Sequence, residues 1–422
     1  MLNVPVERRS LPNGLRVNLS VDRSTPMVGV NLWYAVGSRN ENPGKTGFAH
    51  LFEHMMFQGS ANVPKNRHFE LVEGAGGTLN ASTWFDRTNY YETLPSNHLE
   101  LALWLESDRM GWMLPAMTQE KLENQQEVVK NERKERYDNQ PYGDWDERIQ
   151  GMVFPDTHPY HHSVIGSMED IGAATLDDIA DFFQTFYLPN NAVLTLAGDI
   201  DPERAFQEVE RYFGEIPSGL PIPPIPGKPD LPPVMGTTLR TEVEAEVPLP
   251  RLYLAGRIPP VTSERFQVAE MMSAVLGNGK ASRLYRSLVR EKRIAKDAFC
   301  YVFPLQTGAS LFLLWVTGYP GADPQVLEKA LVAELADLES VSQRELDRAV
   351  ALTETQLLRE IQNVGSRADL LSMFDQLFDD PARLNSEVER IRAVTRDQVR
   401  DLAGEFLGPD NRAILTYLPR GS

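Results

Sequence analysis

The amino-acid sequence predicts an α+β protein made of two similar halves in tandem. Its 422 residues exceed the size at which one hydrophobic core usually stops growing, about 250–300 residues. A proline-rich stretch over residues 217–236 lies almost at the midpoint, and proline favours the extended geometry of a semi-rigid linker. We therefore expect a first domain over residues 1–216 and a second domain over residues 237–422.

Two segments near the ends of the halves resemble each other. An offset of 220 residues relates Thr175 to Thr395 and still relates Asn191 to Asn411. Each segment runs through a helical pattern, a turn and a short apolar strand. The shared order favours duplication over chance similarity, so each half should combine helices with a mainly antiparallel sheet.

The first half opens with strands and then alternates helices with strands. Asn13-Gly14 is a hairpin turn signal before an alternating strand over residues 15–21. A loop rich in glycine and proline, residues 37–44, precedes a helix that begins near Thr46. Periodicity also predicts strands over 28–36 and within 78–94, and helices over 65–73, 97–112 and 118–139.

Charge and cysteine content limit the partners and the chemistry. The net charge of −17 argues against nucleic acid or an anionic membrane as the main partner, because both repel an acidic surface. The charge serves either solubility alone or an acidic chamber that attracts basic peptides. The single cysteine, Cys300, excludes an intramolecular disulfide and is expected to be a small core residue.

The sequence shows neither a signal-peptide pattern nor a membrane-spanning pattern, and the cellular compartment is predicted from these two observations. The first ten residues contain no apolar core of signal-peptide length. The sequence also has no run of about 18 apolar residues that would cross a bilayer. We expect a cytoplasmic protein, unless a leader precedes the sequence given.

The segment His50-Leu51-Phe52-Glu53-His54 carries the strongest chemical signal. A spacing of four places His50 and His54 on one face of a helix, as two ligands of one zinc ion require. Glu53 lies beside them, and the order H-x-x-E-H is that of an inverted zincin. The alternative is a pair of ordinary helix histidines. The apolar flanks favour a metal site, because burying three polar groups is costly unless they act together.

The helix over residues 118–139 offers a third ligand. Leu122, Val128 and Val129 define its apolar face at about 100° per residue. Glu132 and Gln125 fall on that face, so Glu132 is the carboxylate expected to point inward. The other glutamates are expected on the solvated side or, for the last one, at its edge: Glu120, Glu123, Glu127 and Glu135.

The remaining histidines are weaker candidates. Residues 158–162, His-Pro-Tyr-His-His, are a rival source of ligands, but Pro159 suggests a surface loop. His68 and His98 are expected to be ordinary surface or boundary residues. All seven histidines lie in the first half. The positions 220 residues after the motif are Glu270, Ser273 and Ala274, so a duplicated second half has lost the chemistry.

Several further strings resemble the M16, or pitrilysin-type, zinc peptidases. The likeness is to the short bacterial branch related to mitochondrial processing peptidases, and it covers essentially the whole chain. The strings that carry it are residues 11–17 (LPNGLRV), 47–55 (GFAHLFEHM), 80–82 (NAS), 128–133 (VVKNER), 139–143 (NQPYG), 198–200 (GDI) and 282–285 (SRLY).

The resemblance implies a site and a fold. It implies one zinc ion per chain on His50, His54 and Glu132, with Glu53 as the general base. It also implies two ααβ-sandwich halves, of which the first is catalytic. The peptide would be bound as an added strand along residues 80–84, on Asn80, Ala81 and Ser82. In the second half, Arg290 matches an arginine that holds the substrate carbonyl.

Two positions depart from the family pattern. Gln125 stands where many relatives have a glutamate, seven residues before the carboxylate ligand. Asp297 stands where relatives place a tyrosine seven residues after the arginine. Because relatives enclose a chamber with four halves, a dimer is implied. Asp297 favours a heterodimer with a half-sized relative that lacks the histidine motif, and otherwise a homodimer.

These patterns predict a zinc-dependent endopeptidase that cleaves peptides, unfolded segments or leader sequences. One alternative is a non-catalytic scaffold or assembly subunit of the same fold. A second alternative is a zinc hydrolase or lyase that acts on small molecules. The length, the duplication and the strand-like segment at 80–84 favour a polymeric substrate.

Overall fold

The computed structural model describes residues 2–421, and the chain divides into two compact units. The first unit extends to Asn131 and adds Ser163–Pro226 and Leu357–Glu387. The second unit consists of Glu132–His162, Gly227–Gln356 and the chain from Val388 onward. Each unit therefore takes in a segment from the other half of the sequence. The domain limits 1–216 and 237–422 stay a prediction.

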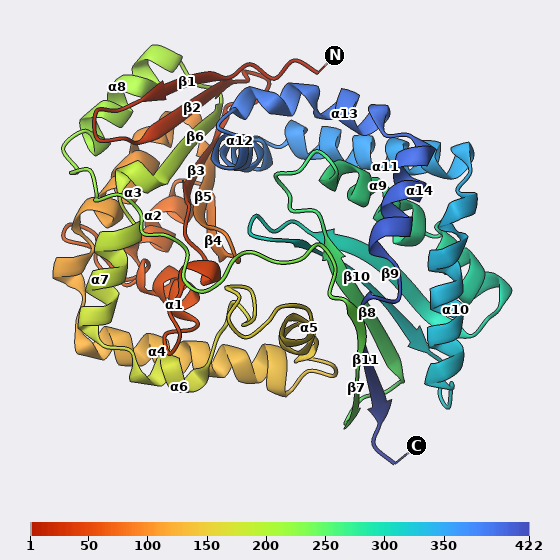
Figure 1. Cartoon of the computed structure of the whole chain (residues 1–422). Coiled ribbons are helices and arrows are strands. Elements are labelled where there is room, and N and C mark those ends of the chain that lie inside the picture. The colour runs from red at the N-terminus through yellow and green to blue at the C-terminus, as the bar shows by residue number, and fades with distance from the viewer. Residues whose placement is uncertain (1, 422) are drawn as a thin grey trace. The chain divides into compact units, whose positions relative to one another are not determined.

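The first unit is built on a six-stranded sheet in the order β1-β2-β6-β3-β5-β4 (Figure 1). Only β2 and β6 run parallel, while the other neighbours are antiparallel. Gly14 forms the predicted hairpin turn with a φ of 93°, a conformation that favours glycine. The strands are β1 (Glu7–Ser10), β2 (Arg16–Val21), β3 (Met27–Tyr34), β4 (Thr78–Thr83), β5 (Thr88–Pro95) and β6 (Ala192–Gly198).

Helices cover both faces of this sheet. The last of them, α12, packs on β3 and β6 so closely that a Cβ on Gly29 would lie 2.7 Å from the Val364 carbonyl oxygen. On the opposite face, α3 packs on β3 and β5. The helices of this unit are α1 (Phe48–Met55), α2 (Arg67–Gly74), α3 (Leu99–Trp112), α4 (Gln119–Arg133), α6 (Met168–Ala173), α7 (Leu176–Phe186), α8 (Pro202–Phe213) and α12 (Val364–Phe378).

The second unit repeats this plan with a five-stranded sheet in the order β7-β11-β8-β10-β9. Only β7 and β11 run parallel. Its strands are β7 (Thr237–Ala245), β8 (Arg251–Ile258), β9 (Ala295–Phe303), β10 (Ser310–Gly318) and β11 (Asn411–Pro419). Its helices are α5 (Trp145–Val153), α9 (Phe266–Gly277), α10 (Pro324–Ala336), α11 (Gln343–Gln362), α13 (Glu387–Ala393) and α14 (Arg396–Phe406).

The sequence repeat corresponds to a structural repeat. Thr175 caps α7 and Thr395 caps α14, each through a reciprocal capping box. After each helix an asparagine amide returns to the helix end: Asn191 donates to the Phe186 carbonyl and Asn411 donates to the Phe406 carbonyl. The predicted α+β class with two duplicated halves and mainly antiparallel sheets is confirmed.

Several local expectations were wrong. Val128, predicted on the inner face of its helix, is 39% exposed. His68, expected near the surface, is fully buried. His158 and Tyr160 were expected in a surface loop, yet both are buried, because the Tyr160 hydroxyl accepts the backbone N–H groups of residues 306 and 307.

Other expectations agree with the structure. Cys300 is buried and has no disulfide partner. Residues 217–236 form neither helix nor strand. Within residues 2–421, no helix is both long and apolar enough to cross a membrane.

Candidate metal centre

The histidine motif lies on α1, a short helix whose start is fixed by a glycine and a buried carboxylate. Gly47 has a φ of 86°, and a Cβ there would lie 2.5 Å from the Ile165 carbonyl oxygen. The Glu41 carboxylate accepts the backbone N–H groups of Gly47 and Ala49 at 2.8 and 2.7 Å. Donors at a helix N-terminus have no partner within the helix, so Glu41 anchors the start of α1.

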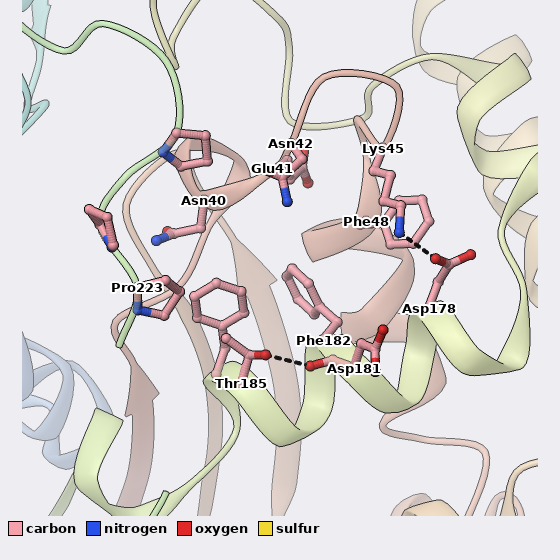
Figure 2. A pocket seen from close by; sticks show the side chains of 13 residues that line it. Asn40, Glu41, Asn42, Lys45, Phe48, Asp178, Asp181, Phe182, Thr185 and Pro223 are labelled. Carbon is pink, nitrogen blue, oxygen red and sulfur yellow. Dashed lines mark hydrogen bonds and ion pairs between the residues drawn. The ribbon is translucent and has the colours of Figure 1, made fainter. Parts of the chain in front are cut away.

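A small pocket lies beside this end of α1 (Figure 2). The cavity measures about 270 Å³. Phe48 of α1 and Phe182 of α7 line it, together with prolines 223, 224 and 226 of the predicted linker. Lys45 pairs with Asp178 across its rim at 2.5 Å. These prolines of the predicted linker therefore lie near the start of the helix that carries the motif.

Three candidate ligands converge at α1. One donor atom each of His50, His54 and Glu132 lies within 4.8 Å of the others. The two imidazole rings stand nearly perpendicular, at 82°. Ligand atoms of a tetrahedral zinc site lie about 3.4 Å apart, given zinc–ligand distances near 2.1 Å. The donor types and their separation therefore fit one zinc ion after a small adjustment.

Glu132 reaches this group because α4 is continuous. It is the first residue assigned to the second unit and the second-last residue of α4. Earlier turns of α4 are fixed in the first unit by the buried Leu122 and Val129, and by Gln126, whose amide donates to the carbonyls of residues 171 and 174. The Glu132 carboxylate also accepts from Arg136, at 2.7 Å.

Glu53 is tied to the end of strand β4. The Thr83 hydroxyl donates to Glu53 Oε2 at 2.5 Å. The Thr88 hydroxyl approaches Thr83 Oγ1 at 3.4 Å from the neighbouring strand β5. A threonine that links the motif to the sheet was not among the predicted site residues. Its only sequence signal is its place one residue after Asn80-Ala81-Ser82.

Strand β4, predicted to bind the peptide, stands at the edge of its sheet and pairs with β5 alone among the described strands. Asn80 is exposed, and its side-chain oxygen accepts the Ala81 N–H at 2.8 Å. That amide would otherwise be an unpaired donor of an edge strand. Ala81 and Ser82 are small, which leaves the backbone of this edge accessible to another strand.

The two departures from the family pattern have defined surroundings. Gln125 is buried on α4 and donates to the Asn124 side chain at 2.9 Å. Asp297 lies on β9 and accepts from the Thr317 hydroxyl at 2.8 Å. Arg290 is exposed on a π-helical turn, Tyr285–Glu291, with its guanidinium 5.9 Å from the Tyr285 ring. Arg290 and Asp297 belong to the second unit and the motif to the first.

A buried ionic cluster was missed by the sequence analysis. Arg109 of α3 pairs with Glu106 and lies 3.9 Å from Glu92 of β5, and all three side chains are buried. Burial and the nearby Glu106 raise the pKa of Glu92. Arg109 also stacks on Phe57, just beyond α1. The signal was a glutamate in the otherwise apolar inward face of β5.

Comparison with known proteins gives consistent matches to both halves. Residues 16–153 match the family model for Insulinase (Peptidase family M16), and residues 173–353 match the model for the Peptidase M16 inactive domain. The first match contains His50, His54 and Glu132, and the second contains no histidine.

Individual relatives extend the comparison over the whole chain. The zinc protease PqqE of Helicobacter pylori is 32% identical over 87% of this chain and 82% of its own length. An uncharacterized zinc protease of Bacillus subtilis, YmxG, is 23% identical over 99% of both chains. The crystal structure of a protease from Helicobacter pylori covers 99% of this chain with a TM-score of 0.93 and 28% identity.

Proposed function

The chain belongs to peptidase family M16, and we propose that it is a zinc-dependent endopeptidase acting on peptides or unfolded segments. The observation that carries the proposal is the convergence of His50, His54 and Glu132 within 4.8 Å. Glu53 lies in the same helical turn. The last residue of the edge strand β4, Thr83, donates a hydrogen bond to the Glu53 carboxylate.

Each residue of the centre has a distinct role in this proposal. The two imidazoles and the Glu132 carboxylate hold one zinc ion per chain. When bound, zinc supplies Lewis acidity that polarises a peptide carbonyl and makes water nucleophilic near neutral pH. Glu53 accepts the proton of the attacking water and passes it to the leaving amine. Thr83 keeps the Glu53 carboxylate in the required orientation.

The substrate is proposed to pair with β4 as an added strand. Asn80, Ala81 and Ser82 present the accessible edge, and backbone pairing accepts many sequences. The Asn80 side chain must leave the Ala81 amide when a peptide takes its place. Arg290 is proposed to contact the substrate carbonyl, as the family resemblance implies.

We propose that the active form is a dimer. Asp297 cannot donate a hydrogen bond to an oxyanion as a phenol would. A heterodimer with a half-sized relative that lacks the histidine motif would supply the missing donor, and a homodimer is the alternative. Light scattering and turnover of the purified chain alone distinguish them: full-rate cleavage by a homodimer refutes the heterodimer. The proposed location is the cytoplasm, which fractionation of native cells would test.

The test of the function combines metal analysis with a peptide digest. The purified chain should bind one zinc ion and cleave unstructured peptides, with products identified by mass spectrometry. Glu53→Gln should keep the zinc and lose turnover, because only the proton acceptor is removed. Normal turnover of Glu53→Gln would refute the role of Glu53. A chain that neither binds zinc nor cleaves peptides would be the scaffold subunit instead.

A further inference from the structure

We propose that a cavity between strands β4 and β5 and helix α12 is a subsite for a basic side chain, lysine or arginine, of the bound peptide. The inference rests on the proposed function only in that the peptide pairs with β4. The cavity measures about 770 Å³. All of its lining residues belong to the first unit, so its geometry is defined within that unit.

The position of the cavity follows from the alternation of side chains along a strand. Thr78, Asn80 and Ser82 of β4 line it, and they pair with Thr93, Tyr91 and Asn89 of β5, which also line it. Leu79, between Thr78 and Asn80, also borders the cavity, whereas Thr83 at the end of β4 points to the other side of the sheet, toward Glu53. An added strand continues this alternation, so every second peptide side chain would lie over the cavity.

Asp369 supplies the recognising charge. Its Oδ1 accepts the side-chain amides of Asn31 at 3.1 Å and Asn89 at 2.8 Å. Within residues 2–421, no donor is bonded to its second oxygen, Oδ2. Burial raises the pKa of Asp369 despite the nearby Arg87. A carboxylate in such surroundings is stabilised by a cation that enters the cavity.

The arginine that lines the cavity, Arg87, donates its hydrogen bonds to Ser82 and Asn89 rather than to Asp369. Its Nη1 donates to the Ser82 carbonyl at 2.8 Å, to the Ser82 hydroxyl at 2.5 Å and to Asn89 Oδ1 at 3.1 Å. The guanidinium also lies 5.2 Å from the Trp33 ring centre. Arg87 therefore braces β4 against β5, and these contacts fix the strand edge to which the peptide would bind.

The rest of the lining suits a long basic side chain. Glu360 adds a second carboxylate, and Asn363 and Ser366 add polar oxygens at the start of α12. Leu370 offers an apolar surface for a methylene stem. An acidic side chain would add a third carboxylate beside Asp369 and Glu360, which share the cavity with Arg87, and an apolar side chain would add no positive charge beside Asp369. Lysine and arginine side chains avoid this repulsion and bring a positive charge to Asp369.

Binding is measured in a Glu53→Gln background, in which the peptide is not consumed. A series of fluorescent ten-residue peptides places a single lysine at each position in turn of an otherwise neutral sequence. In the matched control peptides, norleucine replaces that lysine. Lysine should strengthen binding at alternate positions, with the best about tenfold tighter than norleucine by anisotropy. Asp369→Asn should reduce that ratio below about twofold. Glu210→Gln, which removes an exposed carboxylate of α8, should keep the tenfold ratio.

A second variant guards against misfolding of Asp369→Asn. Ser366→Lys places a cation in the cavity with Asp369 intact and should also abolish the lysine preference. The proposal is overturned if the parent shows no alternating preference, if both variants keep it, or if no peptide binds. Cleavage by the unmodified enzyme separates the two proposals: lysine-dependent binding without cleavage refutes only the peptidase, and cleavage without lysine preference refutes only the subsite.

Discussion

Helices α1 and α9 occupy equivalent places in the sequence repeat but differ in what they expose. In α1 the apolar face is buried, while His50, Glu53 and His54 remain half-buried and available to a ligand. In α9 nearly every residue from Phe266 to Gly277 is buried, including Ser273 at the position equivalent to Glu53. The same fold thus places two candidate ligands on one helix and packing residues on its counterpart, as expected if function depends on the side chains rather than on the fold.

The edge strands β4 and β9 differ in a related way. β4 carries the small residues Ala81 and Ser82 beside the polar Asn80. β9 carries Phe299, Tyr301 and Phe303, whose rings pack on one another and on Trp315. An accessible edge of small residues suits the addition of a peptide strand, whereas stacked rings fill one face of the other edge. Both the histidine motif and the edge of small residues therefore belong to the first unit.

The largest expected effect comes from removing a candidate ligand from α1 and comparing the result with the equivalent substitution in α9. His50→Ala removes one of the three proposed ligands, so zinc affinity should fall by several orders of magnitude and peptide hydrolysis by at least about 10³-fold. Glu270→Ala, at the equivalent position of α9, should change neither. Metal content after dialysis against buffered zinc and the initial rate on one peptide are the measurements.

The ligand assignment has a clear counter-result. Glu132→Ala should behave like His50→Ala, because the Glu132 carboxylate is the proposed third donor. Stoichiometric zinc in both variants would show that the three residues are not the ligands. Loss of zinc from Glu270→Ala would show that the second half contributes to the metal centre.

The sequence predicted the parts of the site that depend on local periodicity. The spacing of His50 and His54 fixes their common face, and the continuity of α4 carries Glu132 to the same place. Val128 was misplaced because the buried face of α4 includes the polar residues Gln125 and Gln126 beside Val129, so hydrophobicity alone does not define that face. The bond from Thr83 to Glu53 joins a strand to a helix 30 residues away, and no periodic pattern encodes such a contact.

The sequence also showed no sign that each unit takes a helix from the other half of the chain. Helix α5 comes from the first half and packs on β8 and β11, while α12 comes from the second half and packs on β3 and β6. Each helix packs on strands that lie far away along the chain. The cavity with Asp369 depends on this exchange, so it could be found only in the structure.

A second prediction compares the asparagines that close the two repeats. Asn411 makes four side-chain hydrogen bonds, with Arg257 twice, Phe406 and Met235. Asn191 makes one, to the Phe186 carbonyl. Asn411→Ala should cost about 3 kcal/mol of unfolding free energy and Asn191→Ala about 1 kcal/mol, because each buried group left unpaired is penalised.

Chemical denaturation monitored by tryptophan fluorescence measures both variants. The equivalent serine substitutions should lie between each alanine variant and the parent, since a hydroxyl keeps part of the bonding. Equal losses for Asn411→Ala and Asn191→Ala would mean that the bonds of Asn411 beyond the shared helix-end contact contribute nothing.

A third prediction concerns the pH dependence of the first unit. Burial and then the nearby Arg109 lower the pKa of His68 to about 4. The unfolded chain has the ordinary value near 6.5, so it binds more protons between pH 6.5 and pH 4. This contribution to stability is complete above pH 6.5 and falls as the pH decreases, by about 2 kcal/mol at pH 5.

The comparison that isolates His68 is the parent against His68→Gln, between pH 7 and pH 5. The variant should lose less stability on acidification, and hydrogen exchange should place the difference in peptides of α2 and α3. His158 of the second unit also has its pKa lowered to about 4 by burial, so His158→Gln should show the same effect in that unit. If the parent and both variants lost the same unfolding free energy between pH 7 and pH 5, the lowered pKa values of the two buried histidines would be contradicted.

The smallest predicted effect tests whether Thr83 orients Glu53. Thr83→Val keeps the shape and removes the donor 2.5 Å from the Glu53 carboxylate, so kcat should fall about tenfold, or about 1.4 kcal/mol, with little change in KM. Thr83→Ser restores the hydroxyl and should recover most of the rate. In the second unit, Thr317→Val removes an equivalent bond to Asp297 and should leave kcat unchanged. If both valine variants lost activity equally, the hydroxyl of Thr83 would have no role beyond that of a structural bond, and the functional difference between the two edge strands would disappear.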